Sequence, residues 1–214
     1  MKHNNTIPKS VISRLPRYHR FLGILQKEGI EKISSKSLAE KMGLTASQIR
    51  QDLNHFGGFG QQGYGYNIEE LRKSIGQIIG IENTHKVILV GAGNLGRAIA
   101  QHLNFQTKGF ELIGIFDSDK KLEGVEINDI CISHFDTVNE FCQKNTPTAA
   151  ILCIPSNAGA AVTERLIECG IKAFWNFSHY NINDDYPDVL VENVHLNDSL
   201  MTLCYNITNS EEIE

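Results

Sequence analysis

Three glycines, Gly91, Gly93 and Gly96, have the spacing that dinucleotide-binding proteins use around a pyrophosphate. An apolar run at residues 86–90 precedes them and a segment with helical periodicity follows, so the order is strand, tight turn and helix. In that order the first glycine permits the turn, the second lets backbone approach the phosphates, and the third lets the helix pack closely on the strand. The N–H groups at the helix N-terminus then face the anion. A glycine turn that binds no dinucleotide is the alternative.

An acidic side chain follows at the distance expected for a ribose contact. The apolar run 112–116 ends at Asp117, about 20 residues beyond the last glycine of the turn. A carboxylate at this position accepts hydrogen bonds from a ribose 2′-hydroxyl and repels a 2′-phosphate. The residues expected to bind the dinucleotide in this way are Gly91, Ala92, Gly93, Asn94, Leu95, Gly96 and Asp117.

The composition is that of an ordinary globular protein. With 214 residues, 41% of them hydrophobic, the chain can form one large domain or two small ones. No apolar run approaches the ~20 residues that span a bilayer, and the polar segment 1–5 lacks the apolar run of a signal peptide, so we expect a cytoplasmic protein. The five cysteines show no Cys-x-x-Cys spacing, which favours reduced, buried packing thiols over a redox or metal site.

Charge is distributed unevenly along the chain. Residues 1–80 hold 12 Lys and Arg against 6 Asp and Glu, whereas the remainder holds 8 against 19. A basic first segment ahead of an acidic cofactor domain is typical of a nucleic-acid-binding module, although a charged patch can also be solvated surface.

Helical segments within the basic region predict a helix-turn-helix. A first helix is expected over 11–25, and two short helices over 34–42 and 45–56 are joined by a tight turn at Gly43. The last of these is the candidate recognition helix, and Arg50 is its strongest candidate for a base or phosphate contact. A surface arginine paired with Asp52 or another neighbour is the alternative. The residues expected to face DNA from this helix are Ser47, Gln48, Arg50, Gln51 and Asn54.

Residues 57–65 contain five glycines, which excludes a stable helix. Aromatic residues bracket this run, so it resembles a β-hairpin wing whose backbone can approach a minor groove; a flexible loop is the alternative. The DNA contacts expected from it are Gln61, Gln62, Gly63 and Tyr64. An amphipathic helix over 68–79 then closes the first domain.

Strands and helices alternate after the glycine turn, which predicts an α/β fold with a doubly wound parallel sheet. A strand is expected within 148–155, a helix over 158–168 and a strand within 171–177. Because ligands lie beyond the carboxyl ends of such strands, Pro155 joins the candidate cofactor site. An amphipathic tail over 197–207 can dock on its own domain or swap onto a partner. The expected domains are a winged-helix domain 1–84, a Rossmann domain 85–193 and a C-terminal helix with tail 194–214.

These features together resemble the Rex family of redox-sensing transcriptional repressors over nearly the whole chain. The most specific matches are residues 47–53 in the recognition helix, residues 56–66 in the glycine-rich segment, the turn at 91–96 and Glu192-Asn193-Val194. The resemblance implies a homodimer with a swapped C-terminal helix and an inverted-repeat operator in double-stranded DNA. It also implies an NAD(H) site at which NADH releases DNA, while NAD+ competes for the site and permits DNA binding.

Three positions depart from the family pattern. His102 stands where many members carry a tyrosine near the nicotinamide, which adds it to the candidate cofactor site. His195 stands where some members carry an aspartate that pairs with an N-terminal arginine, here Arg20, so the two are the candidate inter-domain switch. Ser178 and His179 replace a usual Ala-Pro. These replacements bear on the sensitivity and the NADH/NAD+ preference of the switch. The alternative is that His102 and His195 are partly buried residues with backbone partners.

Two other functions are weighed against the repressor. A small NAD-dependent oxidoreductase needs an acid or base at its substrate, which His102 or His179 could supply. However, no Tyr-x-x-x-Lys occurs and residues 1–80 leave no substrate domain, so we expect no catalytic residues and no enzyme. A DNA-binding regulator that senses another nucleotide, such as coenzyme A, is the second alternative, because the glycine turn recognises mainly pyrophosphate.

Overall fold

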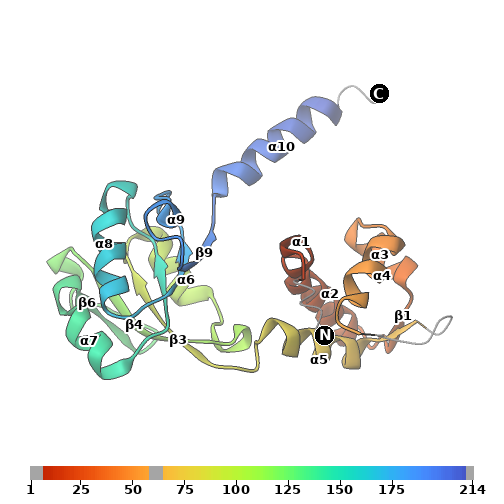
Figure 1. Ribbon diagram of the computed structural model, residues 1–214, viewed down its shortest axis with the longest axis horizontal. Helices are drawn as coiled ribbons and strands as arrows, with labels where there is room; N and C mark the ends of the chain where they lie inside the picture. The colour runs from red at the N-terminus through yellow and green to blue at the C-terminus, as the bar shows by residue number, and fades with distance from the viewer. Residues whose placement is uncertain (1–6, 58–64, 211–214) are drawn as a thin grey trace, which may run out of the picture. The chain divides into compact units, whose positions relative to one another are not determined.

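The computed structural model describes residues 7–57 and 65–210. The chain divides into two compact units, Met1–Glu82 and Asn83–Glu214, coloured red to yellow and yellow to blue in Figure 1. The division falls two residues before the boundary expected from the sequence, and residues 194–214 are grouped with the second unit.

The first unit is a small helical domain. Its helices are α1 (Lys9–Ile12), α2 (Leu15–Lys27), α3 (Ser35–Met42), α4 (Ala46–Asn54) and α5 (Ile68–Ile79). The single helix expected over 11–25 is two helices with a break at Ser13 and Arg14. Pro16, in the first turn of α2, lacks the N–H that would bond to the carbonyl of Ile12, which explains the break.

Local capping sets the helix-turn-helix. The Ser34 hydroxyl accepts the N–H of Ser37 at 3.0 Å and so begins α3, and Gly43 ends that helix with a left-handed φ of 64°. Thr45 in turn accepts the N–H of Gln48 at 3.1 Å and begins α4. Phe56 packs half-buried against the core of this motif, whose buried residues include Leu38, Met42, Ile49 and Leu53.

A short antiparallel pair flanks the glycine-rich segment. β1 (Lys32–Ile33) pairs with β2 (Tyr66–Asn67), where Ile33 lies opposite Tyr66. The candidate DNA contacts Gln61, Gln62, Gly63 and Tyr64 lie outside the described residues, so the expectation for the wing tip stays a prediction.

The second unit contains a seven-stranded sheet in the order β5-β6-β4-β3-β7-β8-β9. β5 is antiparallel to β6, and the other neighbours are parallel. From β6 onward the order is the 3-2-1-4-5-6 arrangement of dinucleotide-binding folds, with the topological switch between β3 and β7. The strands are β3 (His85–Val90), β4 (Phe110–Asp117), β5 (Glu126–Ile127), β6 (Ile130–His134), β7 (Ala149–Leu152), β8 (Ala173–Asn176) and β9 (Leu190–Asn193).

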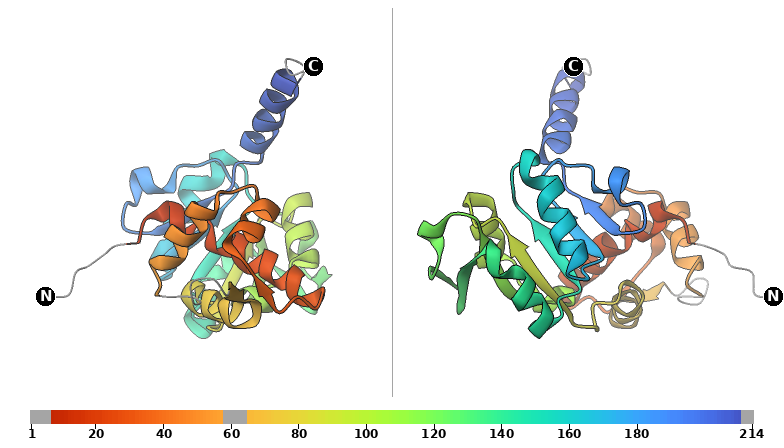
Figure 2. Two further views of the ribbon diagram at one scale, coloured as in Figure 1. Left: turned by 90° about the vertical axis from the view of Figure 1, so that its right-hand side faces the viewer. Right: turned by 60° about the vertical axis from the view of Figure 1, so that its left-hand side comes forward.

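Helices lie on both faces of this sheet, as Figure 2 shows from two sides. One face packs against α7 (Val138–Asn145), α8 (Ser156–Glu168) and α9 (Ile182–Asp185), whereas the other packs against α6 (Asn94–His102). Each face of the sheet has its own apolar core. Alternate residues of β3 belong to one core or the other, because successive strand side chains point to opposite faces. Single-turn 3₁₀ helices at Gln106–Lys108, Lys120–Leu122 and Phe135–Thr137 complete the connections.

The last helix, α10 (Leu196–Ser210), buries none of its residues and extends away from the sheet (Figures 1 and 2). An apolar stripe at helical spacing is more than half exposed, and it consists of Leu196, Leu200, Leu203 and Ile207. Within the described part of the chain, no helix is long and apolar enough to cross a membrane.

Candidate functional site

The glycine turn lies between the end of β3 and the start of α6, at the switch point of the sheet. A Cβ on Gly91, whose φ is 99°, would collide with the carbonyl oxygen of Cys153, and a Cβ on Gly96 would collide with the carbonyl oxygen of Gly91. A Cβ on Gly93, in contrast, would meet no atom within 4 Å. The first and third glycines are therefore required by packing, and the second leaves open space where a ligand can approach.

The N-terminus of α6 has free donors. Gly93 is its N-cap, and among residues 7–57 and 65–210 no side chain accepts its first N–H groups. The N–H groups of Asn94, Leu95 and Gly96 consequently point out of the helix with its positive dipole end, which is the arrangement that binds phosphate oxygens.

Asp117 is bound to this turn directly. One carboxylate oxygen accepts the N–H of Ala92 at 2.6 Å, and the other accepts the N–H of Asp119 at 2.8 Å. Ala92 therefore donates to Asp117, so its N–H is not a free phosphate donor. The two bonds fix the carboxylate at the end of β4, where its remaining lone pairs can accept ribose hydroxyls.

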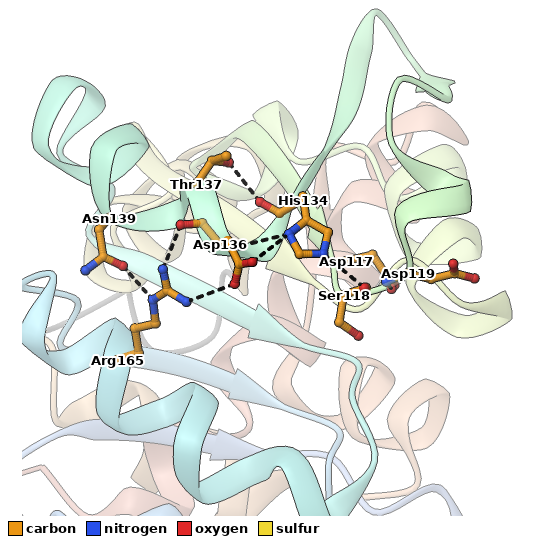
Figure 3. Close-up of polar contacts among 8 residues, drawn as sticks. All are labelled: Asp117, Ser118, Asp119, His134, Asp136, Thr137, Asn139 and Arg165. Carbon is orange, nitrogen blue, oxygen red and sulfur yellow. Dashed lines mark hydrogen bonds and ion pairs between the residues drawn. The ribbon is translucent and has the colours of Figure 1, made fainter.

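His134, at the end of β6, was not among the candidate residues from the sequence. Its Nε2 lies 3.1 Å from the carbonyl oxygen of Ser118, an acceptor only, so Nε2 donates and Nδ1 accepts the N–H of Asp136 at 3.4 Å. Arg165 of α8 extends this chain of contacts, because it donates to the carbonyl oxygen of Asp136 at 2.7 Å (Figure 3). These bonds tie the ends of β4 and β6 to α8 beside Asp117.

Of the remaining candidate cofactor residues, Pro155 lies at this edge of the sheet, whereas His102 lies at the opposite end of α6 from the glycine turn. Pro155 is exposed and is the N-cap of α8, whose first N–H groups also lack a side-chain acceptor. His102 is exposed at the last residue of α6, rather than partly buried. Arg97, which sequence reasoning missed, donates from Nε to the carbonyl oxygen of Ala92 at 2.8 Å and so places a positive charge beside the turn.

The candidate DNA contacts on α4 differ in their exposure and in their hydrogen-bond partners. Ser47, Arg50, Gln51 and Asn54 are exposed. Arg50 donates to the hydroxyl of Ser35 at 3.3 Å and not to Asp52, so the pairing with Asp52 considered from the sequence is wrong. The Gln48 amide donates to Asp52 at 2.8 Å, which orients that side chain and leaves its carbonyl oxygen available.

Asp52 lies on the buried face of α4, is fully buried, and accepts hydrogen bonds from three side chains. Arg14 donates to its two oxygens at 2.7 and 2.8 Å, and the Tyr18 hydroxyl donates at 2.7 Å. Burial alone raises the pKa of the Asp52 carboxyl, but the bonds from Arg14, Tyr18 and Gln48 outweigh it and hold that pKa below its usual value. Burial, and then the bond to Asp52, raises the pKa of Tyr18.

The two candidate switch residues lie in different units. The Arg20 guanidinium carbon lies 5.8 Å from the ring centroid of Phe21 in its own helix. His195 is exposed, and its Nδ1 lies 3.2 Å from Nδ1 of His179. The partly buried alternative is therefore wrong for His195, as it is for His102.

The thiols match their expected burial only in part. Burial raises the pKa of Cys142 and of Cys153 to about 12, so both are unreactive packing groups. Cys131 and Cys204, in contrast, are exposed free thiols. Among the described residues, no group of three or more His, Cys, Asp or Glu side chains could hold a metal ion.

Two protein-family models match the two units separately. Residues 6–54 match a family described as "Putative DNA-binding protein N-terminus", and residues 82–180 match the CoA binding domain. The matched ranges contain the helix-turn-helix and the glycine turn with Asp117, respectively.

Similar proteins match over the full length. The chain is 49% identical over 213 residues to the redox-sensing transcriptional repressor Rex of Thermoanaerobacter sp. (strain X514), covering 100% of this chain and 94% of the relative. A crystal structure of RSP in complex with β-NAD+ and operator DNA is 48% identical, has a TM-score of 0.87, and covers 98% of this chain and 96% of the other. A structure of RSP with β-NADH is 46% identical, with a TM-score of 0.87 and 98% of each chain covered. The chain belongs to the Rex family of redox-sensing transcriptional repressors.

Proposed function

We propose that this protein represses transcription by binding operator DNA through α4, and that NADH bound at the glycine turn releases it. The observation that carries the proposal is the presence in one chain of an exposed polar recognition helix and an uncapped, glycine-lined helix N-terminus beside Asp117. Similar proteins have been solved with β-NAD+ and operator DNA and with β-NADH, which supports both ligands. A repressor that reads operator DNA works in the cytoplasm.

NAD(H) is the nucleotide that best fits the described groups. The N–H groups of Asn94, Leu95 and Gly96 are free for the pyrophosphate, and the space over Gly93 lets it approach. Asp117 would accept the ribose hydroxyls and repel a 2′-phosphate, which favours NAD(H) over NADP(H). Oxidised nicotinamide is cationic and reduced nicotinamide is neutral. A histidine at 195 in place of a carboxylate therefore suits NADH.

DNA binding would depend on α4 and on a second copy of the chain. Ser47, Arg50, Gln51 and Asn54 can reach base edges and phosphates from the major groove, while Asp52, on the buried side of α4, anchors the helix through its bonds to Arg14 and Tyr18. A homodimer would present two such helices to an inverted repeat, because the symmetry of the protein is repeated in the DNA.

We infer that α10 forms this dimer by swapping onto the partner. Its exposed Leu196, Leu200, Leu203 and Ile207 recur at intervals of four, three and four residues, which is the spacing of a helix-packing seam. The sheet face that carries α6 leaves Trp175 and Phe177 only partly buried, so apolar surface is available on the sheet as well. NADH would then act by favouring a rotation of the two DNA-binding units that separates their recognition helices from the half-sites.

A mobility-shift titration on an inverted-repeat operator tests the whole proposal. At a fixed protein concentration, NADH should release DNA, whereas NAD+, NADPH and coenzyme A should leave it bound. Release by coenzyme A alone would replace NADH with the other nucleotide class suggested by the match of residues 82–180. Operator binding that none of the four ligands changes would refute nucleotide sensing.

Single substitutions assign the two sites. Asp117→Ala should weaken NADH binding by about tenfold or more in calorimetry, because the ribose acceptor is lost. Arg50→Ala should weaken operator binding by about 1–3 kcal/mol, whereas the exposed control Lys73→Ala should not. Unchanged affinities for Asp117→Ala or Arg50→Ala would remove that residue from its site. Absence of NADH turnover with a panel of carbonyl compounds would exclude the oxidoreductase.

A further inference from the structure

Two exposed histidines from separate segments meet at the carboxyl ends of β8 and β9. His179 follows β8 and His195 precedes α10, and their Nδ1 atoms are 3.2 Å apart. The ring centroids are 5.3 Å apart and the ring planes differ by 17°. Because the centroids are so much farther apart than the nitrogens, the rings meet edge to edge with their Nδ1 atoms facing each other.

The backbone segments that carry both rings are fixed by one buried residue, Asn176, through its side chain and its backbone. Asn176 donates to the carbonyl oxygen of Tyr180 at 2.8 Å and accepts the N–H of Ser178 at 3.0 Å, so it holds the residues on either side of His179. The backbone carbonyl oxygen of Asn176 also accepts the N–H of Val194, next to His195, at 2.9 Å. The histidine pair is therefore positioned before any ligand arrives.

The backbone at His179 adds to this constraint. Its φ is 60°, in the left-handed region that non-glycine residues rarely adopt. The bonds made by Asn176 maintain that conformation, which turns the His179 side chain toward His195.

The separation of the two nitrogens suits a shared metal ion. Metal–nitrogen distances of about 2.0–2.1 Å and a tetrahedral angle place two imidazole nitrogens about 3.3 Å apart. The observed 3.2 Å lies close to this value. Without metal, one ring donates to the other; with metal, that ring takes the tautomer with its hydrogen on Nε2.

We propose that His179 and His195 bind one divalent first-row transition metal ion, of which Zn²⁺, Ni²⁺ and Cu²⁺ suit imidazole best. Two protein ligands leave the remaining coordination positions to water. Glu192 on β9 and Asp198 in the first turn of α10 add negative charge to the neighbouring segments. The bound ion would connect the turn after β8 to the residue just before α10, so the start of this helix would become more rigid.

The two histidines are adjacent in the structure, although they are 16 positions apart in the chain.

A Zn²⁺ titration of the full-length protein, labelled at histidine and followed by NMR and calorimetry, tests the proposal. One Zn²⁺ should bind per chain, and the imidazole signals of His179 and His195 should shift together. His179→Asn and His195→Asn should each weaken binding by at least about tenfold. Asparagine is chosen because it tolerates the left-handed backbone at position 179. The exposed control His85→Asn should bind Zn²⁺ like the unmodified chain.

Three outcomes would overturn the proposal. They are binding of Zn²⁺ by both variants with the affinity of the unmodified chain, absence of binding at millimolar Zn²⁺, and zinc-dependent shifts confined to residues around the exposed thiols Cys131 and Cys204. The titration requires neither DNA nor nucleotide, so its result does not depend on the repressor proposal.

Discussion

Replacing the buried Asp52 with alanine should strongly destabilise the DNA-binding unit. The carboxylate accepts two hydrogen bonds from Arg14 and one each from Tyr18 and Gln48, all between 2.7 and 2.8 Å. Breaking a buried ion pair costs about 3–5 kcal/mol, and a buried hydroxyl without a partner adds about 1–3 kcal/mol. The Arg14 side chain is 26% exposed and regains hydration, which lowers the total. We expect a loss of about 3 kcal/mol, a large part of the 5–15 kcal/mol typical of a whole domain.

Urea denaturation followed by two probes locates this loss. Trp175 is the only tryptophan, so fluorescence reports the second unit alone, whereas far-UV circular dichroism reports the helices of both units. Asp52→Ala should move the circular-dichroism transition to lower urea by more than about 1 M and leave the fluorescence transition in place. Glu40→Gln, an exposed carboxylate on α3, is the matched control and should change neither.

The double variant Arg14→Ala/Asp52→Ala separates the ion pair from general packing. If the pair carries the effect, the double variant should be more stable than the sum of the two single losses, by about 1.5–3 kcal/mol of coupling. A change of less than about 0.5 kcal/mol in Asp52→Ala would refute the reasoning, because it would mean that the buried carboxylate contributes nothing to the fold.

Three further results are expected. Gly96→Ala should abolish NADH binding and lower the melting temperature, because its Cβ would overlap the Gly91 carbonyl; calorimetry and a melt with unchanged values would contradict this. Asp52 and Tyr18 should leave the unfolding free energy of the first unit constant between about pH 4 and pH 10. The lowered pKa of Asp52 gives stability that is lost as pH falls below about 4, and the raised pKa of Tyr18 gives stability that is lost as pH rises above about 10. Urea titrations whose unfolding free energy changes with pH within this window would be inconsistent with this. Leu200→Asp should convert a dimer to monomers in analytical ultracentrifugation, because the exposed seam of α10 would gain charge, and an unchanged sedimentation coefficient would exclude the seam from the interface.

The elements with strong local signals could be predicted from the sequence. Ser34 and Thr45 begin helices where capping residues are expected, and Gly43 ends one where a left-handed residue is needed. The strands β3, β4 and β7 could also be predicted, because central parallel strands are buried on both faces and therefore consist of continuous apolar runs.

Other parts depend on weaker or nonlocal signals. Asn128 and Asp129 both have positive φ, so they form the two-residue turn between β5 and β6, a hairpin signal that could have located His134. The Arg14–Asp52 pair joins residues 38 positions apart, and no periodicity in the sequence predicts it. The pairing of His179 with His195 likewise arises only when the ends of β8 and β9 become neighbours.

The two backbone hydrogen bonds that Asp117 accepts affect how the cofactor preference of this protein could be changed. The Asp117 carboxylate accepts the N–H of Ala92 and is also the proposed acceptor for the ribose hydroxyls, so on this proposal one group both selects the sugar and fixes the glycine turn. A substitution that merely removes the charge to admit NADPH would therefore loosen the turn that both cofactors require. Redirecting this protein to NADPH calls for a second change that supplies a new acceptor for Ala92, and single-site conversion should fail.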